Sequence, residues 1–413
     1  MSFLGSFRNL LLAVCLMLVL GFLYYSAGKL HMHGWGQELR ESSTEYDRLG
    51  FLLKLDSRTE LEKSVVDNRG DGCTFAATQK DRHYTPCLPT LNYTRSAELS
   101  YKNGNITEGG CRRGFASAQM TAIFPKFSKP APMFLDNTFK QWSKLKDFVP
   151  PFGIKGQEAV IQKILGITKH YTLTSSLDSL SCKRCIIMGN GGIVANKSLG
   201  SRIDEYDVVI RLNEAPVKGF EKDVGSKTTL RITYPEGAIQ KPARYERDSL
   251  FVFAGFKPQD FKWLKYIVFK EKVVLSKDES ELVVFTSPSD GFWKSVATFV
   301  PKEPKEIRIL NPYFIREAAF TFIGLPVNNG MMGRGNIPTL GTVAITMALH
   351  NCDEVAVAGF GYDMNAPNAP LHYYESVKMS AIKESWTHNI GKEKEFLRKL
   401  VKGQVITDLT AGI

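Results

Sequence analysis

The sequence of 413 residues predicts an α/β protein with a single, mainly parallel twisted sheet flanked by helices. Short apolar runs of strand length recur from residue 185 onward, and segments long enough for helices separate most of them. The first run ends directly in the Gly-rich turn 189–192, where ligands approach sheets of this kind.

Six segments have the composition of buried strands. They are 185–188 (CIIM), 207–212 (DVVIRL), 228–233 (TTLRIT), 249–254 (SLFVFA), 307–310 (IRIL) and 354–358 (EVAVA). Apolar residues at helical spacing predict helices at 157–165, 339–350 and about 392–401. Residues 271–290 interrupt this alternation of strands and helices and are interpreted as an inserted surface loop or hairpin.

The composition excludes a disordered or fibrous chain, with 43% hydrophobic and 23% charged residues. Lys and Arg number 53 against 42 acidic residues, a net charge of +11 that suits an anionic ligand or a membrane surface. The positive charges are scattered, which argues against nucleic acid as a partner.

Residues 10–27 are apolar and uncharged over a length that can cross a bilayer, and Arg8 precedes them. We interpret them as a transmembrane signal anchor, the alternative being a cleaved signal peptide. Residues 1–9 would then be a cytoplasmic tail, 28–110 a lumenal stem and 111–413 the folded domain. Three sequons, at Asn92, Asn105 and Asn196, agree with a glycosylating compartment.

The cysteine count also favours an oxidising compartment. Seven are present, and setting aside Cys15 in the apolar segment leaves an even six. The CxxC at 182–185 could be half of a zinc site, but no second CxxC exists, so structural disulfides are preferred. No metal-binding DxD occurs in the chain.

The Gly-rich turn after the first strand would let backbone amides approach a phosphate, although a tight turn without a ligand has the same composition. A dinucleotide-binding site requires an acidic residue at the end of the second strand, but this chain has Asn213 there. A mononucleotide is therefore favoured over NAD as the ligand. Two histidines, His372 and His388, lie in polar loops. Loop histidines are usually surface residues, yet an imidazole can accept a proton from a hydroxyl at neutral pH.

Four segments in this order resemble the motifs of the animal sialyltransferases. They are 182–236, 337–361, the HYYE at 372–375 and the HxxxxE at 388–393. The resemblance implies a Rossmann-like sheet of the variant GT-A type. It also implies inverting, metal-independent transfer of sialic acid from CMP-N-acetylneuraminate to the 3-hydroxyl of terminal galactose. The acceptors would be N-acetyllactosamine-type glycans of glycoproteins, with glycolipids left open.

The resemblance also assigns roles to residues. His388 would be the general base, His372 would donate to the leaving phosphate, Glu393 would hold the loop of His388, and Tyr234 would line the site beside the acceptor. The residues implied for binding CMP are Asn190, Gly191, Asn213, Thr339, Leu340, Gly341, Gly359, Gly361 and His372. No cofactor is implied.

The resemblance implies the disulfide Cys185–Cys352, and with it we expect Cys111–Cys182 and Cys73–Cys87. It implies a single-pass type II protein of the Golgi membrane with a lumenal catalytic domain. The implied partners are CMP-sialic acid, galactose-terminated glycans and the Golgi membrane. A homo-oligomer and a shed soluble form stay open.

Three alternatives remain at this point. One is a sialyltransferase that forms another linkage or uses an acceptor such as Galβ1,3GalNAc or a glycolipid. Another is a noncatalytic glycan-binding protein that keeps the nucleotide fold. The third is an NAD-dependent oxidoreductase, which the chemistry at the strand ends disfavours.

Overall fold

The computed structural model describes residues 110–413, except 128–130, 142, 271–291, 329, 331–334, 364 and 384–386. Several expected features lie outside the described residues: the tail, the anchor, nearly all of the stem with Asn92, Asn105 and Cys73–Cys87, and the insertion at 271–290. Within the described residues, no helix has both the length and the apolar composition needed to cross a membrane.

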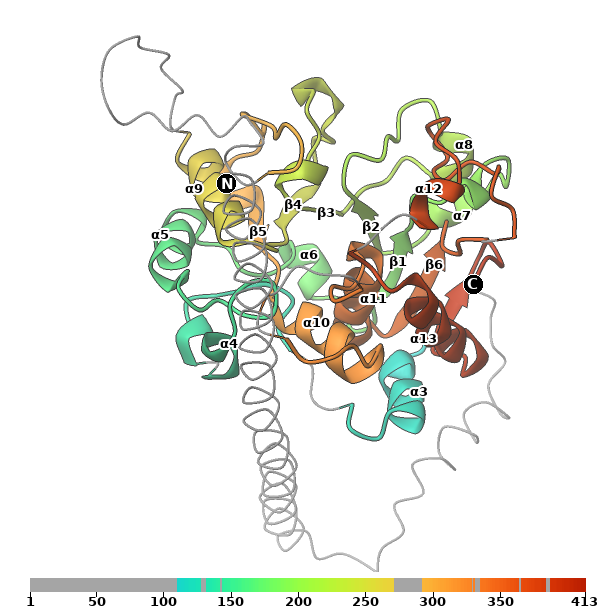
Figure 1. The fold of residues 1–413 in the computed structure, drawn as a ribbon, viewed down its shortest axis with the longest axis horizontal. Helices are drawn as coiled ribbons and strands as arrows, with labels where there is room; N and C mark the ends of the chain where they lie inside the picture. Colours follow the sequence, from blue (N-terminus) through green and yellow to red (C-terminus); the bar gives the residue numbers. More distant parts are fainter. Residues whose placement is uncertain are drawn as a thin grey trace, which may run out of the picture. The chain divides into compact units, whose positions relative to one another are not determined.

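Seven strands form one sheet in the order β5-β4-β3-β2-β1-β6-β7, and every neighbouring pair is parallel (Figure 1). The strands are β1 (Arg184–Met188), β2 (Val208–Leu212), β3 (Leu230–Thr233), β4 (Leu250–Phe253), β5 (Ile307–Ile309), β6 (Glu354–Ala358) and β7 (Ile406–Asp408). The chain adds β1 to β5 in one direction and then returns beyond β1 to add β6. This reversal between β1 and β6 is the kind of switch point at which open α/β sheets bind ligands.

The six predicted strands are confirmed to within two residues at each end. β7 was missed because it is only three residues long and its Thr407 is exposed, so it carries no apolar run. Pairing with β6 makes it a strand, since Ala356 lies opposite Thr407 in the parallel register.

Both faces of the sheet are buried, which explains why its strands read as continuous apolar runs. In β1, Cys185 and Ile187 join one hydrophobic cluster while Ile186 and Met188 join another on the opposite face.

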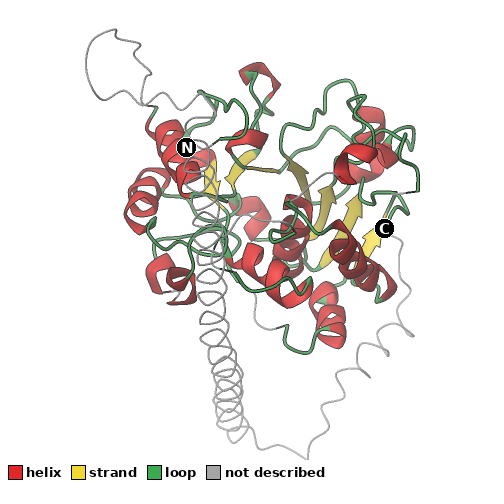
Figure 2. Ribbon diagram, in the orientation of Figure 1, coloured by secondary structure: helices red, strands yellow, loops and turns green. Residues whose placement is uncertain are grey.

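Helices cover both faces, as Figure 2 shows. One face is covered by α3 (Phe115–Ile123), α10 (Tyr313–Arg316), α11 (Leu340–Asn351) and α13 (Ile390–Lys402), and the other by α5 (Glu158–Thr168), α7 (Gly200–Asp204), α8 (Glu221–Val224) and α9 (Pro258–Phe269). The shorter helices are α4 (Ser143–Asp147), α6 (Ser175–Asp178) and α12 (Ser380–Lys383). The predicted helices correspond to α5, α11 and α13, whereas α9 was not predicted individually.

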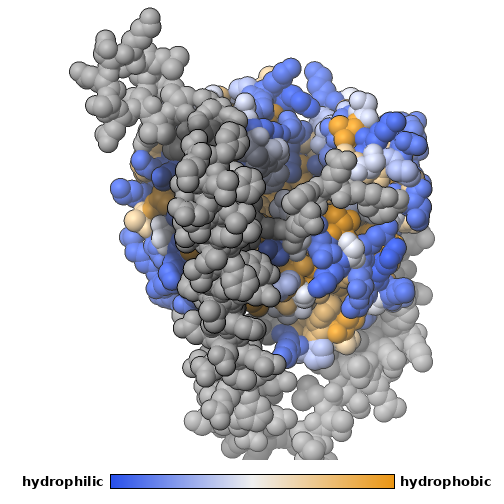
Figure 3. Space-filling view, viewed as in Figure 1, coloured by the Kyte–Doolittle hydropathy of each residue, from blue (hydrophilic) through white to orange (hydrophobic). Residues whose placement is uncertain are grey.

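The described part of the chain contains two disulfides, Cys185–Cys352 and Cys111–Cys182, and both are expected pairs. The first joins β1 to the residue that follows α11, so it fastens the sheet to the helix packed on it. The surface visible in Figure 3 is mostly hydrophilic, with several separate hydrophobic patches.

Candidate active site

A cavity of about 450 Å³ lies at the carboxyl ends of the strands. The residues that follow β1, β2, β3, β4 and β6 contribute to its wall, together with the beginnings of α11 and α13. Every residue predicted for catalysis or CMP binding lines this cavity except Gly191. Those that do are Asn190, Asn213, Tyr234, Thr339, Leu340, Gly341, Gly359, Gly361, His372, His388 and Glu393.

The turns after β1 and β6 pack closely where the strand order reverses. The Gly189 N–H donates to the Ala358 carbonyl at 2.7 Å, and a Cβ on Gly189 would lie 2.4 Å from the Gly359 oxygen. Gly359 itself has φ +74°, a conformation that L side chains rarely adopt. Glycine is therefore required here to bring the two backbones together, and this close packing places both turns in the wall of one cavity.

Gly191 lies beside the cavity but is not among the residues that line it. Its N–H donates to the Gly359 carbonyl at 2.9 Å, and the residue pairs with His372 in a short antiparallel bridge. Its amide joins two loops of the site and is not available to a ligand, and contact of Gly191 with CMP stays a prediction.

Asn213 follows β2 with φ +53°, an uncommon conformation that asparagine tolerates better than most residues. The buried Arg231 guanidinium fixes this turn by donating to the Asn213 carbonyl at 2.6 Å. Glu246 accepts from Arg231 Nε at 2.9 Å, so two charged side chains position the asparagine from behind.

The N-terminus of α11 faces the cavity through Thr339, Leu340 and Gly341. Thr339 is the N-cap, and its hydroxyl accepts from the Thr342 N–H at 3.3 Å. A helix N-terminus carries partial positive charge and free backbone donors, which suits a phosphate.

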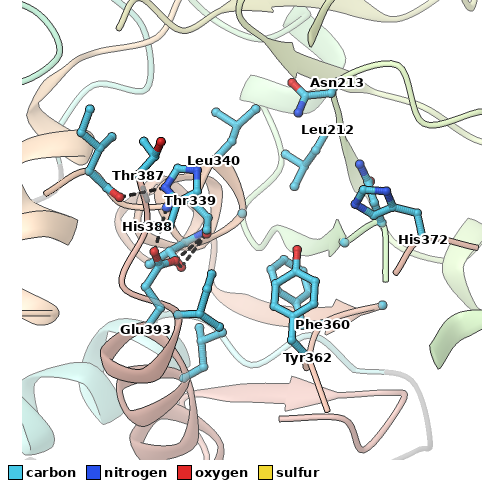
Figure 4. A pocket seen from close by; sticks show the side chains of 18 of the residues that line it. Leu212, Asn213, Thr339, Leu340, Phe360, Tyr362, His372, Thr387, His388 and Glu393 are labelled. Carbon is cyan, nitrogen blue, oxygen red and sulfur yellow. Dashed lines mark hydrogen bonds between the residues drawn. The ribbon is translucent and has the colours of Figure 1, made fainter. Parts of the chain in front are cut away.

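Glu393 connects α13 to the start of α11. Its Oε1 accepts from the Thr339 N–H at 3.0 Å, and its Oε2 accepts from the hydroxyls of Thr339 and Thr342, each at 2.5 Å (Figure 4). Burial raises the pKa of the Glu393 carboxyl. Glu393 therefore positions the helix N-terminus, and its predicted role in holding the loop of His388 stays a prediction.

His388 lies just before α13, and its Nδ1 is 2.9 Å from the Ile337 carbonyl oxygen. A carbonyl can only accept, so Nδ1 carries the hydrogen and the neutral ring keeps a lone pair on Nε2. In this tautomer the imidazole can act as a general base.

His372 lies across the cavity from His388 in Figure 4. Its Nδ1 contacts the Glu375 carboxylate, and its ring stacks on Tyr374 with centroids 5.4 Å apart. The next residue anchors the loop, because the Tyr373 N–H donates to the Asn190 carbonyl at 3.1 Å. With Nδ1 directed to a carboxylate, Nε2 is the nitrogen available to a ligand.

The sequence did not single out three residues that line the same cavity beyond β3 and β4: Glu236, Lys257 and Trp293. The Tyr234 ring packs edge-on against Phe256 and lies beside Trp293, with centroids 5.5 Å and 6.5 Å apart. Burial raises the pKa of Tyr234 to about 12, so it stays a neutral phenol. The signal that could have found Glu236 and Lys257 is their place just after the carboxyl ends of two predicted strands.

Among the described residues, no group of three or more His, Cys, Asp or Glu side chains is arranged to hold a metal ion. The third sequon, at Asn196, lies on the exposed surface after β1. Its backbone N–H donates to Asp223 at 2.9 Å, which fixes the loop.

Comparison with known proteins identifies the family. The profile of glycosyltransferase family 29 (sialyltransferase) matches residues 134–405. A mouse protein named CMP-N-acetylneuraminate-beta-1,4-galactoside alpha-2,3-sialyltransferase is 65% identical over the full length of both chains, and its human counterpart is 64% identical. A rat lactosylceramide alpha-2,3-sialyltransferase is 39% identical over 79% of this chain and 83% of its own.

A solved structure has the same fold. The crystal structure of a mammalian sialyltransferase in complex with Gal-beta-1-3GalNAc-ortho-nitrophenol superposes with a TM-score of 0.52, covering 73% of this chain and 99% of its own at 23% identity. The sequence match over most of the folded part and the shared fold lead to one conclusion: the chain belongs to glycosyltransferase family 29, the sialyltransferases.

Proposed function

We propose that this protein transfers sialic acid from CMP-N-acetylneuraminate to the 3-hydroxyl of a terminal galactose on N-acetyllactosamine-type glycans. The names of the relatives at 64–65% identity support this activity. The observation that carries the chemistry is the hydrogen bond from His388 Nδ1 to the Ile337 carbonyl, because it leaves a basic Nε2 in the same cavity as a phosphate-compatible helix N-terminus.

The donor occupies the part of the cavity formed by the turns after β1, β2 and β6. Asn190 and Asn213 contact the nucleotide there, and the N-terminus of α11 contacts the phosphate. Gly359 and Gly361 keep the backbone packed closely beside the donor, since both have positive φ and a Cβ on either would collide with the backbone of Gly189 or Gly412. Gly341 allows the same close packing at the start of α11, because a Cβ on it would lie 2.7 Å from the Phe360 ring.

The reaction is a single displacement with inversion. The galactose O3 attacks the anomeric carbon of sialic acid while His388 Nε2 takes the hydroxyl proton. The bond between that carbon and the phosphate oxygen breaks, and CMP leaves with the electron pair. His372 Nε2 and the N-terminus of α11 stabilise the charge that develops on the phosphate.

No metal is required in this proposal, because the histidines and the helix N-terminus offset the phosphate charge and the sequence has no DxD to bind a divalent cation. Residues 10–27 anchor the chain as a type II protein, with the catalytic domain in the Golgi lumen. The three sequons and the even number of cysteines beyond the anchor support this location.

The test incubates the purified full chain with CMP-sialic acid and EDTA. The acceptors are Galβ1,4GlcNAc, Galβ1,3GlcNAc, Galβ1,3GalNAc and lactosylceramide, and product linkages are determined by methylation analysis. Sialylation of lactosamine at the 3-position, unaffected by EDTA, is expected. Transfer to another position would contradict the linkage, and loss of activity in EDTA that added metal restores would contradict the metal-free step. Binding of CMP without transfer to any acceptor would indicate the noncatalytic alternative.

A further inference from the structure

The cavity has two ends of different charge. At the end formed by β1, β2 and β6, the wall combines amide side chains, glycine backbone, a helix N-terminus and His372, a set that suits an anion. At the end formed by β3 and β4, Glu236 and Lys257 line the wall, and Asp260 lies behind them.

The second end carries more negative than positive groups. Lys257 Nζ pairs with Glu236 Oε1 and lies 3.4 Å from Asp260 Oδ1, and both carboxylates are fully buried. Two carboxyl groups against one ammonium do not favour the anionic donor. An uncharged, hydroxyl-rich molecule fits this end better, because each of its hydroxyls can both donate and accept.

The buried carboxylates retain unused bonding capacity. Among the described residues, Glu236 Oε2 has no hydrogen-bond partner, and Asp260 Oδ1 has only its 3.4 Å ion contact with Lys257 Nζ. Lys257 is the member of the cluster with accessible surface, at 16% of its side chain, so it is the one that a ligand can touch. An ammonium held from behind by carboxylates is a preorganised donor for a sugar hydroxyl.

An aromatic side chain completes this end. Trp293 lines the cavity but is 63% exposed, so it lies at the mouth. Its indole is held beside Tyr234, with ring centroids 6.5 Å apart, and Lys294 Nζ lies 5.4 Å from its centroid. An exposed indole offers an apolar surface on which the C–H face of a pyranose can pack.

We propose that Trp293 and Lys257, the latter positioned by Glu236, form a subsite for the uncharged sugar that follows the terminal galactose of the acceptor. The reacting galactose must reach His388 in the interior, so the next ring of the glycan lies toward the mouth, where Trp293 is. This inference rests on the proposed function. It specifies which sugar of the acceptor is bound at the mouth of the cavity.

The test compares Galβ1,4GlcNAc with methyl β-galactoside as acceptors for the full chain and for Trp293→Ala. In the variant the KM for the disaccharide is expected to rise about 10-fold, because the stacking is lost. The KM for methyl β-galactoside and the KM for CMP-sialic acid should stay unchanged. Phe299→Ala is the matched control, since Phe299 is a 51% exposed aromatic outside the cavity wall.

Glu236→Gln supplies a second measurement. It keeps the size of the side chain and removes the charge that holds Lys257. A rise in disaccharide KM at unchanged kcat and unchanged donor KM is expected, whereas a merely structural role would lower the melting temperature without this selective change.

The outcomes separate the two proposals. Failure of the unaltered chain to sialylate either acceptor would overturn the proposed function. The other outcome concerns an unaltered chain that is active. If Trp293→Ala then raises the KM for the disaccharide and for methyl β-galactoside equally, or raises neither, the subsite alone would be overturned.

Discussion

His388 is the residue whose geometry most directly implies a chemical step. Its Nδ1 is committed to the Ile337 carbonyl, so proton uptake must occur at Nε2. Replacement by alanine removes the base and leaves the donor end of the cavity unaltered. We expect His388→Ala to lower kcat by roughly 10²–10⁴-fold, with thermal protection by CMP retained.

The control is His170→Ala, since His170 is exposed and does not line the cavity. Its rate should equal that of the unaltered chain. Retention of full activity in His388→Ala would show that another group takes the proton.

Asp260 makes stability depend on pH. It accepts from the backbone N–H groups of Phe256 at 2.8 Å and Lys257 at 3.0 Å, and burial raises its pKa to about 6. A raised pKa means that the folded state favours the protonated carboxyl. The resulting stabilisation is complete below about pH 4, the ordinary pKa of aspartate, and is lost as the pH rises through about 6.

The variant that tests this is Asp260→Asn, which keeps an oxygen acceptor but cannot ionise. Between pH 4 and 7 the free energy of unfolding of the unaltered chain should fall by roughly 2–3 kcal/mol relative to the variant. Denaturant unfolding at several pH values measures the difference, and parallel pH curves for the two proteins would contradict it.

At the scale of elements, the site depends on how helices end at the cavity. α11 begins at Leu340, after its N-cap Thr339, and α13 begins at Ile390. Glu393 joins the two beginnings through three hydrogen bonds. Glu393→Ala would leave the buried Thr342 hydroxyl and the Thr339 amide without this acceptor. We expect a loss of roughly 1–3 kcal/mol in the free energy of unfolding and a higher KM for the donor, because the helix N-terminus that faces the phosphate is no longer fixed.

Glu395→Ala, on the same helix, is the comparison for this variant. Glu395 is exposed and pairs with Lys399 at 3.1 Å, so its loss should change stability by less than about 1 kcal/mol. Equal effects of the two substitutions would show that Glu393 contributes only helix propensity or surface charge.

At the scale of the whole molecule, the disulfide Cys185–Cys352 joins residues 167 apart in sequence. A cross-link over so long a loop restricts the unfolded chain, by about 4–5 kcal/mol in the loop-entropy account. The double variant Cys185→Ala, Cys352→Ala should therefore unfold at a clearly lower denaturant concentration. An unchanged midpoint would mean that packing of α11 on the sheet holds this region without the bond.

The net charge of +11 should also strengthen binding of the donor, because CMP-sialic acid carries two negative charges. Positive potential around the cavity would draw the donor in, and salt screens such attraction. The KM for CMP-sialic acid is expected to rise with ionic strength, while the KM for the uncharged acceptor stays constant. A donor KM that is independent of salt would show that the net charge does not contribute to donor binding.

The sequence by itself determined the features that depend on local composition. Apolar runs identified β1 to β6, because strands buried on both faces have apolar residues at most positions and not only at alternate ones. The motifs around Asn190, Asn213, His372 and His388 named many of the residues that line the cavity. Asn190 and Asn213 meet there because they follow the carboxyl ends of neighbouring parallel strands.

Only the tertiary structure decided features that depend on contacts between distant segments. β7 is a strand because β6 pairs with it, Gly191 donates its amide to Gly359, and the tautomer of His388 follows from a carbonyl 51 residues away. Lys257 becomes part of the cavity because Glu236, from the neighbouring strand end, pairs with its ammonium. Such contacts join chain segments that carry no local signal for each other, so the folded arrangement alone brings them together.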